Sequence, residues 1–167
     1  KFYRLRDASP FLMVDISLMT PSTKDKSLAR EMHGRPLVHF DKGNWTEAPP
    51  ADPEGLAKRL ATRRDSMRKT FDLFSVLIIK ELNRGNDIEA IGFYHGFTLR
   101  PLVELLRMKY LPERHGFHTR YIHYDLPKEV QARLHALFFV TDGLDIRRKQ
   151  AEAERWFAVL MGSFPAT

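Results

Sequence analysis

The chain has 167 residues, of which 43% are hydrophobic and 29% charged, a composition that excludes a disordered chain and predicts a globular protein with a real core. The absence of cysteine excludes disulfides, thiolate metal ligands and a thiol nucleophile, and it favours the cytoplasm as the location. The formal net charge of +6 favours nucleotides, RNA or acidic proteins as partners. No apolar run approaches the ~20 residues of a membrane span, so we expect no membrane contact.

Residues 1–43 have the alternating pattern of β-strands. Residues 2–6 and 11–19 flank the turn-forming segment 7–10, which predicts a hairpin, and residues 36–40 predict a short third strand. In the second strand, the period of two places Asp15 on a face with large apolar neighbours. Two or three strands do not form a stable sheet unaided, so we expect this antiparallel segment to complete a sheet or to pack on helices.

A proline-rich linker, residues 44–55, separates the strands from a helical domain over residues 56–167. Pro49, Pro50 and Pro53 oppose regular strand pairing and an uninterrupted helix in the linker. Across it, the hydrophobic period changes from two to about 3.6. This change predicts an α+β fold with the strands before the linker and the helices after it.

Four helices are predicted after the linker. The first is long; it begins with Asp52 as its N-cap and ends near Gly85. A second covers residues 87–110, and Pro101 must kink it or start a new segment there, because proline has no N–H to donate. Their short connections predict a mainly antiparallel four-helix bundle. The two remaining helices begin at Pro127 and after Asp142.

The connection from residue 101 to residue 127 concentrates cationic and aromatic side chains. Guanidinium and ammonium groups there would suit an anionic ligand. The alternative is structural, because basic residues gather at helix C-termini and could pair with nearby Glu104, Glu113 and Asp125. The sequence leaves both interpretations open. The candidate nucleotide or phosphate contacts are Arg107, Lys109, Arg114 and Arg120.

The same connection holds a histidine cluster, His115, His118 and His123. Their spacing could supply two metal ligands, but no run of carboxylates lies near them in the sequence, so histidines that pack or donate hydrogen bonds are the favoured interpretation. Other signatures of chemistry do not occur: the sequence has no Gly-rich phosphate loop, no paired-His zinc helix and no G-x-S-x-G elbow.

Four segments follow one another along the chain: FLMVDISLM, the proline-rich link, a long helix ending in KELNRG, and FYHGFTLRPLVELLRMKYLPERHGFHTRYIHYDLP. In this order they resemble the C-terminal part of bacterial nucleotidyltransferases related to polymerase β, in a branch of uncharacterised function. In that superfamily an Asp-x-Asp pair and a third carboxylate on a later strand bind two Mg²⁺ ions. The resemblance implies that Asp15 is this third carboxylate, both a catalytic residue and a metal ligand. The alternative is structural: an aspartate on a partly exposed strand, or one paired with Arg4 or Arg6 across the hairpin.

The Asp-x-Asp pair and the Gly-Ser turn of that superfamily have no counterpart in this sequence, which starts at Lys1 with strand-like residues. We therefore expect that a catalytic portion lies upstream, since one carboxylate cannot hold two Mg²⁺ ions. The leading hypothesis is the C-terminal portion of an enzyme that transfers a nucleoside monophosphate from an NTP to an unknown acceptor. The alternative is a non-catalytic helical module that binds an acidic protein or a nucleic acid such as RNA.

Overall fold

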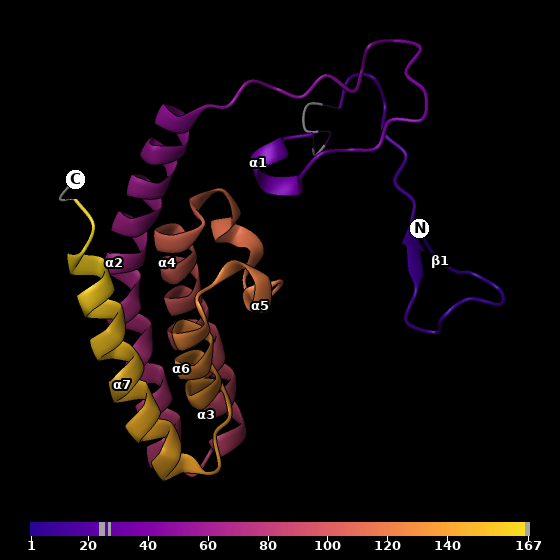
Figure 1. Ribbon diagram of the computed structural model, residues 1–167. Helices are drawn as coiled ribbons and strands as arrows, with labels where there is room; N and C mark the ends of the chain where they lie inside the picture. Colours follow the sequence, from indigo (N-terminus) through magenta and orange to yellow (C-terminus); the bar gives the residue numbers. More distant parts are fainter. Residues whose placement is uncertain (24–25, 27, 166–167) are drawn as a thin grey trace. The chain divides into compact units, whose positions relative to one another are not determined.

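The computed structural model describes residues 1–23, 26 and 28–165, and the chain divides into two units, residues 1–51 and 52–167. The described residues form one small antiparallel sheet and a larger set of helices (Figure 1). The predicted mixture of strands and helices is confirmed in this general form. Strands lie only in the first unit, and all the long helices lie in the second, within the described residues.

The sheet of the first unit is a two-stranded hairpin. Strand β1 (Phe2–Arg4) pairs with β2 (Met13–Asp15), and Tyr3 lies opposite Val14. Both strands are shorter than the predicted segments 2–6 and 11–19. The short helix α1 (Arg30–His33) follows.

The third strand predicted over residues 36–40 does not form, so the lower of the two predicted strand counts is correct for the described residues. A strand needs a neighbouring edge to satisfy its backbone N–H and C=O groups, and alternation alone does not supply one. Moreover, no described side chain of residues 1–51 is buried, and Phe11 and Leu18 are almost fully exposed. The hairpin therefore has no core of its own in this unit.

The second unit begins with the long helix α2 (Pro53–Asn83). The Asp52 carboxylate caps it by accepting a hydrogen bond of 2.8 Å from the Gly55 N–H, as the sequence predicted. Its inward face carries buried Leu60, Met67 and Ile78, at the spacing expected of an amphipathic helix.

The predicted second helix is continuous but irregular. It consists of α3 (Asp87–Phe93), a π-helical segment η1 (Tyr94–Leu99) and α4 (Arg100–Tyr110). The π segment lies directly before Pro101, which cannot donate to the carbonyl one α-turn back. Instead the Arg100 N–H reaches the His95 carbonyl, five residues earlier. Both His95 and Arg100, which this wide turn joins, line the same hollow.

Two further helices complete the core. Helix α6 (Lys128–Phe138) contacts the π segment, and α7 (Gly143–Gly162) packs along α2 and α4 (Figure 1). The Phe71 and Phe157 rings stack between α2 and α7 with their centroids 3.7 Å apart. A short 3₁₀ helix η2 (Pro112–Phe117) and helix α5 (Ile122–Asp125) lie between α4 and α6. Among the described residues, no helix is both long and apolar enough to cross a membrane.

One buried hydrogen bond joins the π segment to the end of α6. The hydroxyl of Tyr94, which is fully buried, donates to the Leu137 carbonyl at 3.0 Å. A carbonyl in the last turn of a helix has no partner within the helix, so Tyr94 satisfies it and sets the distance between η1 and α6. The next residues along each element, His95 and Phe138, face each other at a ring separation of 5.5 Å.

We predict that Tyr94→Phe lowers the free energy of unfolding by about 1–2 kcal/mol, because the Leu137 carbonyl then loses its buried donor. Urea denaturation followed by circular dichroism measures this change. Tyr124→Phe is the matched control, since Tyr124 is 88% exposed and should change stability by less than about 0.5 kcal/mol. Equal effects of the two substitutions would contradict the role of the Tyr94 hydroxyl.

Candidate functional site

The centre of the site is a buried arginine on α4. Arg107 has no exposed surface, and its guanidinium donates to the Asp125 carboxylate at 2.8 Å and to the His118 carbonyl at 2.7 Å. A further bond reaches the Arg120 carbonyl. Arg114 also donates to Asp125, at 3.1 Å. A buried ion pair offsets the cost of desolvation only when such additional hydrogen bonds satisfy its polar groups, as they do here.

Arg107 thereby holds a tight turn in a strained conformation. The Arg120 N–H donates to the Phe117 carbonyl at 3.1 Å, and His118 has φ 52° and ψ −127°. These are the angles of the first central residue of a type II′ turn, a position that normally requires glycine. Holding a histidine there costs about 1–3 kcal/mol. Since Arg107 binds the carbonyls of His118 and Arg120, it restrains the turn on both sides.

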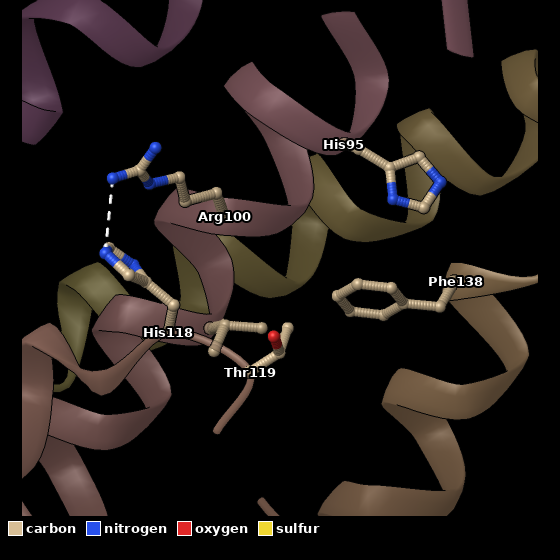
Figure 2. A pocket seen from close by; sticks show the side chains of 6 residues that line it. His95, Arg100, His118, Thr119 and Phe138 are labelled. Atoms are coloured by element: carbon tan, nitrogen blue, oxygen red, sulfur yellow. Dashed lines mark hydrogen bonds between the residues drawn. The ribbon is translucent and has the colours of Figure 1, made fainter. Parts of the chain in front are cut away.

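The central residues of this turn, His118 and Thr119, border a hollow of about 420 Å³. Figure 2 shows the Arg100 side chain reaching His118, with a separation of 3.2 Å between Arg100 Nη2 and His118 Nε2. Because arginine only donates, this contact is a hydrogen bond in the tautomer of His118 whose Nε2 accepts. At the opposite end of the hollow lie His95 and Phe138 (Figure 2).

The lining of the hollow favours an anion. Arg100 contributes a full positive charge with several N–H donors, and Thr119 contributes a hydroxyl. Val103 supplies apolar surface, and none of the described residues that line the hollow is a carboxylate. An anionic group therefore meets a cation and further donors without a competing negative charge.

The four predicted phosphate contacts fall into two pairs. Arg107 and Arg114 bind Asp125, so both have the structural partner that the sequence had left as the alternative. Lys109 and Arg120 are exposed on the surface. Their charges lie near aromatic faces: the Arg120 guanidinium is 5.4 Å from the Tyr121 ring centroid. Lys109 and Arg120 therefore stay candidates for contact with a ligand, whereas Arg107 offers a ligand no surface.

The three histidines of the connection do not converge. His115 contacts the carboxylate of Glu104 at 3.5 Å, whereas His118 contacts Arg100 and His123 contacts a glutamine of α6. Over the described ranges, no group of three or more His, Cys, Asp or Glu side chains could hold a metal ion together. This arrangement agrees with the interpretation that the histidines serve packing and hydrogen bonding.

Glu104 is the second buried charge of α4. Arg63 of α2 binds it with two parallel hydrogen bonds, of 2.7 and 2.8 Å. Burial by itself raises the pKa of the Glu104 carboxyl, but the bonds from Arg63 and His115 outweigh burial and lower the pKa to about 2. Glu104 is therefore ionised at neutral pH and joins α2 to α4 and η2, next to the Arg107 network on the same helix.

Asp15 lies in the other unit, at the end of β2. Its side chain is 55% exposed, and its carboxylate is 3.7 Å from the backbone nitrogen of Lys1. A single exposed carboxylate does not provide the donor set of a two-metal site. The assignment of Asp15 as a catalytic residue and metal ligand therefore stays a prediction, because the Asp-x-Asp pair that would complete the site has no counterpart in this sequence.

Arg100, Thr119, His95 and Phe138 were not predicted as site residues from the sequence, where Phe138 is expected only to face inward from its helix. Only Pro101 gave a signal, because a proline inside a helical pattern indicates an irregular turn, and the backbone bond of that turn joins Arg100 to His95. A histidine at the glycine position of a type II′ turn has no signature in the sequence, because the tertiary bonds of Arg107 impose it.

We predict that Arg107→Gln and Asp125→Asn each lower the free energy of unfolding by about 3–5 kcal/mol, because each removes one partner of a buried ion pair. The double substitution should cost less than the sum of the two, as expected for a direct pair. Urea denaturation of the four proteins measures this coupling. Lys109→Gln, an exposed change on the same helix, is the control and should cost less than about 0.5 kcal/mol. Additive losses would contradict the pairing.

No protein-family model matches the chain, and no curated protein or solved structure is significantly similar to it. The resemblance to nucleotidyltransferases thus remains a hypothesis that depends on the order of sequence motifs. The function has to be argued from the site itself.

Proposed function

We propose that the helical unit is a binding module for an anionic ligand and that the ligand's charged group binds at Arg100, His118 and Thr119. The observation that supports this function best is the lining of the hollow, which contains a cation and no carboxylate among its described residues. The proposal shares with the alternative considered for the sequence, a module that binds an acidic protein or a nucleic acid, that it is non-catalytic. We also propose that the long helices are arranged as an antiparallel bundle and that the protein is located in the cytoplasm.

The strained turn supports a functional role for His118. A non-glycine residue in this conformation destabilises the fold, and such residues concentrate at ligand-binding sites where the surrounding structure holds them. Glycine would remove the strain, but it would also remove the imidazole beside Arg100. The presence of histidine is therefore explained if its ring contributes to binding.

The expected affinity for a simple anion is modest. A hydrogen bond to a charged group contributes about 1.5–3 kcal/mol, so two of them supply the ~4 kcal/mol that correspond to a dissociation constant near 1 mM. A larger ligand would bind more tightly through additional contacts. Lys109 and Arg120 remain proposed phosphate contacts for a ligand that extends over the surface, such as an RNA strand, since Arg120 lies beside an exposed tyrosine.

We predict that inorganic phosphate binds the full chain with a millimolar dissociation constant, measured by nuclear magnetic resonance from the shifts of the Thr119 and Arg120 amides. Arg100→Gln should weaken binding about tenfold or more, because it removes the charge at the hollow. His118→Gly should also weaken binding, yet leave the melting temperature unchanged or higher, because glycine relieves the turn.

Arg155→Gln is the matched control for charge, since Arg155 is an exposed arginine of α7 outside the hollow. It should leave phosphate affinity within about twofold, while raised salt should weaken binding to the parent protein. Phosphate shifts that are not saturable, or that Arg100→Gln leaves unchanged, would remove the proposed function.

The transferase hypothesis makes a separate prediction about Asp15. If this chain acts with an upstream catalytic portion, then Asp15→Asn in the complete protein should abolish Mg²⁺-dependent incorporation of label from an NTP. The stability of the Asp15→Asn variant should change by less than about 1 kcal/mol, because the Asp15 side chain is 55% exposed. If the parent protein and the Asp15→Asn variant incorporate label equally, or if neither incorporates any, Asp15 is not a catalytic residue.

A further inference from the structure

The two ends of the hollow have different chemistry. Arg100 and His118 form a polar end, and His95 and Phe138 form an aromatic end, with the apolar Val103 also in the lining (Figure 2). The two aromatic rings meet edge to face, at an interplanar angle of 76°. Each end is built by different elements: the polar end by α4 and the strained turn, the aromatic end by the π segment and α6.

The aromatic end carries no charge at neutral pH. Burial lowers the pKa of His95, so its imidazole is neutral there and presents a flat ring, as does the phenyl group of Phe138. An anion gains nothing from these two groups. A flat ring, in contrast, can stack on either of them.

The size of the hollow also exceeds what a simple anion needs. Its volume of about 420 Å³ lies within the range of roughly 300–1,000 Å³ that is typical of small-molecule sites. Such sites combine apolar and aromatic walls with a few polar groups that orient the ligand, and the hollow has both kinds of wall.

We infer that the ligand of the hollow is a phosphorylated compound with an aromatic ring, of the size of a nucleoside monophosphate. Its phosphate binds Arg100, His118 and Thr119, and its ring stacks against His95 and Phe138. This inference rests on the proposed anion-binding function and adds the ring. Stacking of one base contributes enough to strengthen binding about tenfold or more over the phosphate alone.

Three probes that differ by one part each test the inference with the full chain: AMP, ribose 5-phosphate, which lacks the base, and adenosine, which lacks the phosphate. Isothermal titration calorimetry or resonance shifts give the dissociation constants. We expect AMP to bind about tenfold more tightly than ribose 5-phosphate and adenosine to bind most weakly. Arg100→Gln should weaken binding of AMP and of ribose 5-phosphate by similar factors.

Phe138→Leu keeps an apolar side chain at the end of α6 but removes the ring. It should reduce AMP affinity to nearly that of ribose 5-phosphate and leave ribose 5-phosphate unchanged, and its melting temperature reports whether it folds. If the Phe138→Leu variant does not fold, the dissociation constants of the three probes for the parent protein test the inference.

The outcomes separate this inference from the proposed function. If AMP and ribose 5-phosphate bind equally well and both depend on Arg100, the ring site is wrong and the anion site stands. If neither binds, or if Arg100→Gln changes neither affinity, the proposed function and the inference are both overturned. Adenosine binding as tightly as AMP would likewise overturn both, because the phosphate would then contribute nothing.

Discussion

The structure of the site depends on the hydrogen bonds of one buried guanidinium. Arg107 projects from α4 and binds a carboxylate of α5 together with two carbonyls of the turn between η2 and α5. A buried arginine without partners would be strongly unfavourable, so the connection has to fold in the one arrangement that supplies them. This requirement explains how a connection of short helical pieces keeps a defined shape and how it holds His118 in a strained conformation.

The same requirement separates the basic residues into two groups with different roles. Arg107 and Arg114 both bind Asp125, and the charge of the fully buried Arg107 therefore contributes to stability. Arg100 lies at the start of α4 instead, where its side chain is exposed and borders the hollow. Basic residues that cluster in a sequence therefore need not form one binding site, because some pair with carboxylates inside the fold and others stay exposed to a ligand.

Two features of the helices shape the hollow. The π segment before Pro101 joins Arg100 to His95 through a backbone hydrogen bond, and the bond from Tyr94 to the end of α6 holds Phe138 opposite His95. Both features involve backbone groups that a regular α-helix would leave unsatisfied. The groups that complete the backbone hydrogen bonding thus also position the walls of the site.

The sequence by itself determined the positions and the ends of the long helices, because caps, prolines and hydrophobic period act within a few residues. Asp52, Pro101 and Asp142 mark these boundaries correctly. Only the tertiary structure decided which arginine is buried, which histidine occupies a type II′ turn and whether residues 36–40 find a strand partner. These outcomes depend on groups that are distant in the chain, such as Arg107 and Asp125, and local pattern carries no information about such pairs.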